Sequence, residues 1–461
     1  MIFATGLPQI KTFLRPARLR ASTQSLLVRL LAVLCCPAGR PSAAAAAQAI
    51  RSERRHRAAI VRFLARRQWS RDWSVLSAVA DLLLQAETRR DGRWLFIVDQ
   101  TYVGQQGQKT ENTFSRANYR RRPKKSNRKQ KKYAKRSCHG FVCGLLLTPS
   151  GFRIPCCRSY YTEGYCQAQK RPYRTQIQLA AELIRDVRVP TGAEVVVLGD
   201  TAFEAKEIRQ ACDKRHFLWV VPINPERVLA GPTPRPKVAS LTQELSAEHF
   251  EPVRLLPGQG AYAAQQRAAR CRVGPKAKAR TFWVHTERRA VHNIGDVHLV
   301  FSTKEQPHAG QAVQVQKILV SNALRWSAAE VVQTYALRWQ IELFFKEMKG
   351  TLGLHRYRFR QFTKVENWVQ AALVAFVYLE WYRAQQLACS DLPEVQRRWW
   401  QDQRIWGVRQ VLTEDVVEHD LAQAYRWMRT PTGRRKLRRA LRHALPSEPG
   451  PEPQKTRRKA G

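Results

Sequence analysis

The segment from Tyr335 to Lys349 carries side chains that could hold and cut a phosphodiester. On a helix that turns about 100° per residue, Tyr335, Arg338, Glu342 and Lys349 fall within a sector of roughly 60°. Arginine, lysine and tyrosine can hold phosphate oxygens, and a glutamate oxygen can bind a hard divalent cation. The spacing predicts one helix with a polar stripe, to which Lys346 adds a further cation. A solvated face with a Glu342–Lys346 ion pair is the alternative interpretation.

Two aspartates could complete a metal site with Glu342. Asp99 ends the apolar run RWLFIVD and Asp200 ends PTGAEVVVLGD, and such runs are typical of strands covered on both faces. Acids that end neighbouring strands can converge at one edge of a sheet. Three carboxylates around one cleft can hold two Mg²⁺ or Mn²⁺ ions, which relieve their mutual repulsion and support phosphoryl transfer. Taken singly, each aspartate could equally be a turn residue.

The elements that must position these acids alternate between strand and helix. In chain order we expect a strand at 93–99, a hairpin at 138–156, a helix at 173–187, a strand at 190–200, a helix at 203–214 and a strand at 216–224. This order predicts an α/β protein with a mixed sheet.

Shifts in composition divide the chain into six expected regions. They are a helical, basic N-terminal region that contacts DNA or a partner at 1–90, a first part of the core at 91–223, a β-rich insertion at 224–318, a second part of the core at 319–388, a helical C-terminal region at 389–445 and a disordered tail at 446–461. Arg29 interrupts the apolar run at 25–36, and no A-x-A cleavage site follows, so we do not expect export. No other apolar run is long enough to cross a membrane.

The charge of the chain points to a polyanionic partner. Lys and Arg number 80 and Asp and Glu 36, which gives a formal net charge of +44. Nucleic acid is the commonest polyanion, and a ribosomal-type scaffold or an anionic membrane surface is the alternative. The run RRRPKKSNRKQKKYAKR at 120–136 is expected to lie along DNA, or else to be a disordered or localisation segment. Its candidate contacts are Arg120, Arg121, Arg122, Lys124, Lys125, Arg128 and Lys131.

The spacing Tyr335-x2-Arg338-x3-Glu342-x6-Lys349 matches the Y-R-E-K signature of one transposase family. Over about residues 94–385 the chain resembles DDE transposases of the insertion-sequence family four type. The segments VDQT and LGDTAF, which contain Asp99 and Asp200, look like those around that family's two aspartates.

The resemblance implies an RNase H-like catalytic core interrupted by a β-rich insertion and flanked by helical regions. Asp99, Asp200 and Glu342 would bind two Mg²⁺ or Mn²⁺ ions, and Tyr335, Arg338 and Lys349 would contact phosphates near the transposon end. The enzyme would cut DNA at the ends of an insertion sequence and join the 3′ ends to target DNA.

The implied partners are double-stranded DNA, as terminal inverted repeats and as target, and a second copy of the chain on paired ends. The expected location is the bacterial cytoplasm, on the nucleoid, with no membrane contact.

Some members of the family flip a base onto an aromatic side chain. Trp283 is the candidate by location, or else a core residue of a sheet, and His139 either approaches the metals or is structural. A catalytically decayed or regulatory DNA-binding relative and a plain metal-dependent nuclease are the alternative functions.

Overall fold

The computed structural model describes residues 7–36, 41–50, 56–66, 69, 71–89, 91–105, 110–117, 135–255, 262, 265, 280–386, 394–401 and 428–444. Most of the cationic run at 120–136 and all of the expected tail at 446–461 lie outside these residues.

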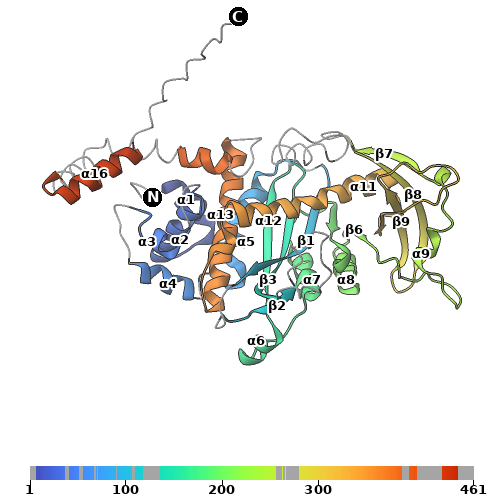
Figure 1. Ribbon diagram of the computed structural model, residues 1–461, viewed down its shortest axis with the longest axis horizontal. Coiled ribbons are helices and arrows are strands. Elements are labelled where there is room, and N and C mark those ends of the chain that lie inside the picture. Colours follow the sequence, from blue (N-terminus) through green and yellow to red (C-terminus); the bar gives the residue numbers. More distant parts are fainter. Residues whose placement is uncertain are drawn as a thin grey trace, which may run out of the picture.

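Within the described residues, ten strands form one mixed sheet (Figure 1). They are β1 (Trp94–Gly104), β2 (Phe114–Ala117), β3 (Lys135–Leu147), β4 (Arg153–Tyr160), β5 (Val195–Leu198), β6 (Leu218–Pro222), β7 (Glu251–Leu255), β8 (Arg280–Val291), β9 (Gly295–Thr303) and β10 (Lys317–Ser321). The strands expected from the apolar runs are therefore present.

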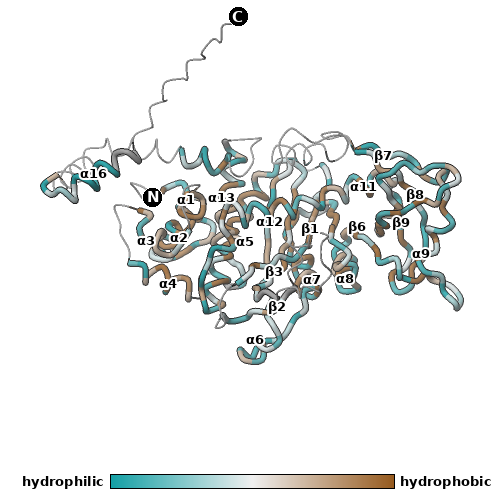
Figure 2. The backbone as a smooth tube through the Cα atoms, in the orientation of Figure 1, coloured by the Kyte–Doolittle hydropathy of each residue, from teal (hydrophilic) through white to brown (hydrophobic). Residues whose placement is uncertain are grey.

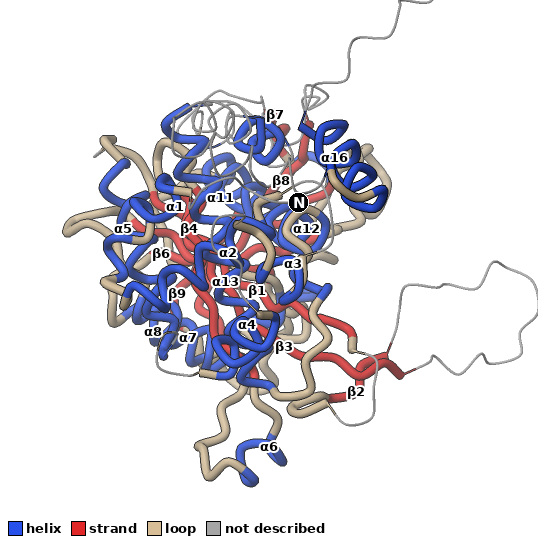
Figure 3. Tube along the Cα trace, turned by 90° about the vertical axis from the view of Figure 1, so that its left-hand side faces the viewer, coloured by secondary structure: helices blue, strands red, loops and turns tan. Residues whose placement is uncertain are grey.

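The first half of the sheet has the order β4-β3-β1-β5-β6. β3 is antiparallel to β1 and to β4, whereas β1, β5 and β6 run parallel to one another. Three antiparallel strands followed by two parallel ones make an RNase H-like core, so the predicted fold class is confirmed. β2 pairs with the start of β3, and this pair extends away from the body of the molecule (Figure 3).

The strands of the expected insertion continue the same sheet. β10 lies between β6 and β9 and is antiparallel to both. β9, β8 and β7 then follow as antiparallel neighbours. The chain therefore leaves the core after β6, makes three strands, and returns through β10, which joins them to the core.

Helices cover both faces of the sheet and form a cluster at its β4 end. The helices are α1 (Pro8–Phe13), α2 (Ala21–Leu34), α3 (Ala43–Ala47), α4 (Arg57–Ala65), α5 (Ser74–Ala86), α6 (Glu163–Ala168), α7 (Gln176–Asp186), α8 (Lys206–Asp213), α9 (Val238–Leu241), α11 (Ala328–Ala336), α12 (Gln340–Gly350), α13 (Phe362–Gln386) and α16 (Pro431–Ala444), with short 3-10 turns η2 (Arg71–Trp73), η3 (Thr201–Phe203), η5 (Leu337–Trp339) and η6 (Leu354–Arg356). Among the described residues, no helix is long and apolar enough to cross a membrane.

Two contacts of β1 show which helices cover which face. The hydroxyl of Tyr102 lies 3.4 Å from Oε1 of Gln176 in α7. Asp99, three residues earlier, is ion-paired with Arg338 of η5. Because successive side chains of a strand point to opposite faces, α7 covers one face and the α11–α12 segment covers the other.

Helix α13 is the centre of the helical cluster. Apolar residues surround it, as expected for a helix buried on all sides, and Val365 to Leu379 are almost completely buried where apolar. Figure 2 shows hydrophobic residues along α13 and in the central strands. The side chain of Asn367 donates a hydrogen bond to the carbonyl of Leu64, 2.6 Å away, which links α13 to the end of α4. The N-terminal helices therefore belong to the packed body of the protein.

Candidate active site

The register of two parallel strands brings Asp99 and Asp200 to the same level of the sheet. The last paired residues of β1 and β5 are Ile97 and Leu198. Each aspartate follows the last paired residue of its strand by two positions, so the two strands carry their acids to the same level. The carboxylate of Asp200 also accepts a 2.9 Å hydrogen bond from the backbone N–H of Ala202, which fixes the turn into η3.

The expectation that Asp99 ends its strand was wrong. β1 continues to Gly104, and Asp99 pairs with Cys143 in the middle of the long β3. β5 is much shorter, so only its pairing with β1 stops before Asp99. The acid therefore lies on a strand held by one neighbour alone.

The single helix predicted for the segment from Tyr335 to Lys349 was also wrong in detail. Tyr335 lies in the last turn of α11, Arg338 lies in the 3-10 turn η5, and Glu342 and Lys349 lie in α12. The residues on either side of η5 keep right-handed helical dihedral angles, so the path stays helical. Ile341 and Phe344 of α12 are buried, whereas the side chain of Glu342 is partly exposed.

Arg338 connects two of the three acids. Its Nη1 lies 3.5 Å from Oδ2 of Asp99, and its Nη2 lies 3.4 Å from Oε1 of Glu342. Only 16% of the Arg338 side chain is exposed, against 38% of Glu342. The guanidinium group therefore lies between Asp99 of β1 and Glu342 of α12, and its positive charge stabilises both carboxylates.

The charges of the two other acids act on Asp99. Burial raises the pKa of Asp99 to about 6, and the negative charges of Asp200 and Glu342 raise it further, while Arg338 and a hydrogen bond from the N–H of Gln100 oppose the rise. A carboxylate in such surroundings gains from an added cation.

The donor set fits hard divalent cations, although its side chains are not arranged as a finished metal site. Within the described part of the chain, no three His, Cys, Asp or Glu side chains stand close enough together to hold a metal ion. Arg338 lies between Asp99 and Glu342 instead. Three carboxylates that repel one another are nonetheless the oxygen ligands that Mg²⁺ and Mn²⁺ prefer.

The family of the chain follows from a sequence comparison that spans this whole arrangement. Residues 90–378, more than half of the chain, match the family model of the transposase DDE domain. The chain belongs to this family. It is therefore a DNA transposase by family, and Asp99, Asp200 and Glu342 all lie in the matched part.

Comparison with solved structures finds a second transposase. The structure is the piggyBac transposase in a cryo-EM synaptic complex with hairpin DNA, which shares 11% sequence identity and a TM-score of 0.40. The similarity covers 96% of this transposase and 84% of that chain. Among curated proteins, none matches.

The predicted phosphate contacts of the transposase differ in exposure. Burial raises the pKa of Tyr335 to about 12, so its hydroxyl stays protonated and can donate to a phosphate at neutral pH. Lys346 is exposed, and Lys349 is partly buried, with Nζ 5.8 Å from the centroid of the Phe345 ring. The predicted contacts at Arg120, Arg121, Arg122, Lys124, Lys125, Arg128 and Lys131 lie outside the described residues.

Two aromatic residues have contrasting positions. Trp283 of β8 is partly buried and packs against the hydrophobic core. Trp339, which sequence reasoning did not select, is 59% exposed directly after Arg338. The sequence signal for Trp339 was its spacing: it follows Tyr335 by four residues, which places both on the same side of a helix.

His139 has a structural position. It is fully buried in β3, with Nδ1 2.9 Å from the hydroxyl of Tyr357 and Nε2 3.0 Å from the carbonyl oxygen of Glu111. Burial lowers its pKa. Both ring nitrogens are engaged away from the acids, which supports the structural alternative.

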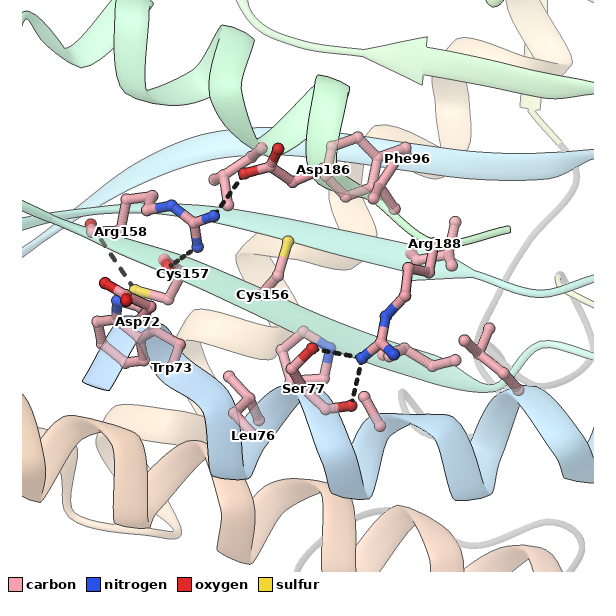
Figure 4. A pocket seen from close by; sticks show the side chains of 17 residues that line it. Asp72, Trp73, Leu76, Ser77, Phe96, Cys156, Cys157, Arg158, Asp186 and Arg188 are labelled. Carbon is pink, nitrogen blue, oxygen red and sulfur yellow. Dashed lines mark hydrogen bonds and ion pairs between the residues drawn. The ribbon is translucent and has the colours of Figure 1, made fainter. Parts of the chain in front are cut away.

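A separate cavity of about 130 Å³ lies between α5, β4 and α7. Figure 4 shows Cys156 pointing into it, with Arg158 reaching Asp186 and Arg188 reaching Ser77 at its rim. Burial raises the pKa of the Cys156 thiol to about 12, so the thiol is neutral at physiological pH. The cavity lies on the α7 side of the sheet and is too small for DNA, so it is not part of the candidate active site.

Proposed function

We propose that this transposase cuts DNA at the ends of an insertion sequence of the family-four type and joins the freed 3′ ends to target DNA. The main support is the position of Asp99 and Asp200 at the same level of two neighbouring parallel strands, with Arg338 linking Asp99 to Glu342. These three acids are the proposed ligands of two Mg²⁺ or Mn²⁺ ions. Bound there, the ions would activate the attacking oxygen and stabilise the leaving oxygen.

The reaction we propose has two steps, hydrolysis at the element end and transfer of the freed strand. In the first, water attacks the phosphorus at the element end, the bond to the 3′ oxygen breaks, and that oxygen becomes a hydroxyl. In the second, this 3′-hydroxyl loses its proton and attacks a phosphorus of the target strand, whose own 3′ oxygen leaves. Tyr335, Lys346 and Lys349 bind phosphate oxygens beside the acids and so orient the strand.

The proposed partners are double-stranded DNA at the terminal inverted repeats and in the target, and a second copy of the chain when two ends are paired. The cationic run at 120–136 would bind DNA backbone, and a formal charge of +44 would favour location on the bacterial nucleoid. If the reaction passes through a DNA hairpin, Trp283 is the proposed stacking residue by its place in the insertion.

The test uses a duplex copied from the DNA that flanks the reading frame. The wild type should cut it only with Mg²⁺ or Mn²⁺ and should join the cut end to a plasmid. Glu342→Gln, which keeps the size of the side chain, should bind the duplex with similar affinity and leave it uncut. Strand-transfer products separate a transposase from a plain nuclease, and binding without cleavage by the wild type would indicate a decayed or regulatory protein.

A further inference from the structure

Lys317 approaches the candidate active site from the sheet, opposite the helical residues. It is the first residue of β10, and its Nζ lies 5.0 Å from the centroid of the Tyr335 ring, within the range of a cation–π contact. Among the described residues, no carboxylate forms an ion pair with its ammonium group. Lys317 is therefore a cation beside an aromatic ring and, in the described part of the chain, outside any direct ion pair.

The pairing of β9 with β10 adds a second cation beside it. Ser302 stands opposite Lys317, and its hydroxyl donates a 3.1 Å hydrogen bond to the Lys317 carbonyl oxygen. Lys304 lies in the bend directly after β9, and its positive charge acts on Lys317. Both lysines are exposed, and the ammonium group of Lys317 contacts the Tyr335 ring.

The local charges favour an anion at this place. Partial desolvation of the Lys317 ammonium group lowers its pKa, the positive charges of Arg338 and Lys304 lower it further, and Asp200 opposes them. Because Arg338 is already paired with Asp99 and Glu342, the two lysines face the single charge of Asp200, which leaves an excess of positive charge between β10 and α11. A phosphate would relieve this excess and could accept hydrogen bonds from both lysines and from Tyr335.

We propose that Lys317 and Lys304 form a second phosphate-binding site, which holds the DNA strand on the β10 side of the scissile linkage. The site takes a phosphodiester of the DNA substrate, and it rests on the proposed function. Tyr335 would then lie between two phosphate contacts, with Lys317 on the sheet side and the α12 lysines on the helix side.

The first experiment measures DNA binding by the full chain across a salt series. The probe is the labelled duplex copied from the flanking DNA, in EDTA so that no cutting occurs, and the readout is fluorescence anisotropy. The variants are Lys317→Gln and Lys304→Gln. The control is Lys214→Gln, which changes an exposed lysine at the end of α8. Helix α8 packs against α7, on the face of the sheet opposite the α11–α12 segment.

Each active-site variant should lower the steepness of the plot of log affinity against log salt by about 1, because roughly 0.9 counterions are released for each phosphate contact. Lys214→Gln should leave the slope unchanged. Lys317→Arg should restore it, since arginine also binds phosphate. Melting temperatures of all variants check that a change in slope is not a change in folding.

The second experiment locates the contact on the DNA. Single phosphates of the duplex are replaced in turn by neutral methylphosphonate. One replacement near the cut site should weaken binding to the wild type and add no further loss to Lys317→Gln, because the two changes remove the same contact.

The inference is overturned if Lys317→Gln matches Lys214→Gln in slope and in the methylphosphonate series. A wild type that binds the duplex but never cuts it would contradict the proposed catalysis, and the slopes would still decide the role of Lys317. The two failures are therefore distinguishable.

Discussion

Arg338 lies 3.5 Å from Asp99, so a helix-borne cation neutralises a strand-borne acid that we propose as a metal ligand. The same guanidinium group lies 3.4 Å from Glu342. The sequence assigned Arg338 only to phosphate contact, and its position gives it a second task, which is to compensate the charge of the acids before metal or DNA arrives.

Replacement of Arg338 by Gln should make the stability of the protein depend more strongly on divalent metal. In EDTA the variant should lose about 1–2 kcal/mol, a value between those for exposed and buried ion pairs, because two carboxylates lose their partner. Added Mg²⁺ should raise its melting temperature by more than that of the wild type, since the ion replaces the lost charge. Calorimetry with and without Mg²⁺ measures both effects, and an equal response of the two proteins would contradict the assigned task.

The elevated pKa of Asp99 predicts a pH-dependent effect of Asp99→Asn. The pKa is about 6 in the folded protein and 3.8 ordinarily, so the stabilising contribution is complete below pH 3.8 and is lost as the pH rises through 6. Asn cannot ionise. The variant should therefore gain stability over the wild type between pH 4 and pH 7, by at most about 3 kcal/mol at about 1.36 kcal/mol per unit of pKa. Its DNA cleavage should be lost.

Urea unfolding in metal-free buffer at several pH values measures this difference. Asp91→Asn is the matched control, because the side chain of Asp91 is 85% exposed and its loss should leave the pH profile unchanged. Parallel profiles for the wild type and Asp99→Asn would mean that burial and the charges of the other acids do not raise the pKa of Asp99.

Arg153→Met should destabilise the protein by about 3–5 kcal/mol. Arg153 of β4 is completely buried and pairs with Glu347 of α12 and with Glu380 of α13, its Nε lying 3.1 Å from the Glu380 carboxylate. Methionine would leave two acids without their shared partner in the core. Because Glu347 lies on the same helix as Glu342, cleavage should fall as well.

The matched control is Arg158→Met on the same strand. Arg158 pairs with Asp186 over 2.7 Å, and the two side chains are 27% and 59% exposed. Such a surface pair contributes about 1 kcal/mol or less. Chemical denaturation compares the two variants, and equal losses would argue against a buried network that fixes α12.

Gly144→Ala should cost about 1–3 kcal/mol, as overpacking of a filled core does. A Cβ at this position of β3 would lie 2.6 Å from Cε2 of Phe96 and 2.7 Å from the sulfur of Cys156. Gly164→Ala in α6 is the control, because a Cβ there meets nothing within 4 Å and alanine favours a helix by about 1 kcal/mol. Thermal unfolding should move the two variants in opposite directions.

The parts of this fold that the sequence made predictable are those encoded by local pattern. The apolar runs before Asp99 and Asp200 predicted two strands, and the parallel pairing of β1 with β5 agrees with an α/β core. The end of a strand was less predictable. Asp99 remains inside β1 because β3 is long enough to pair past it, and the length of a neighbour cannot be read from the apolar run itself.

Relationships across the chain could not be predicted. The run that contains Lys317 reads as an ordinary strand, and only its position between β6 and β9 carries the lysine to Tyr335. Trp339, which is exposed, lies in a 3-10 turn that the sequence did not predict. Periodicity assigns residues to a face, but the packing of other elements decides what that face meets.

The place of β10 in the sheet has a consequence for synthesis. A ribosome-bound chain that has reached only β9 exposes one unpaired edge on β6 and another on β9, and such edges attract other strands. The arrival of β10 closes both edges together, and the helix that carries Glu342 emerges soon afterwards. The nascent polypeptide thus contains Asp99 and Asp200 but lacks Glu342 until β10 has paired with β6 and β9. It would therefore complete its proposed catalytic residues only after the stage at which its strand edges are most prone to aggregation.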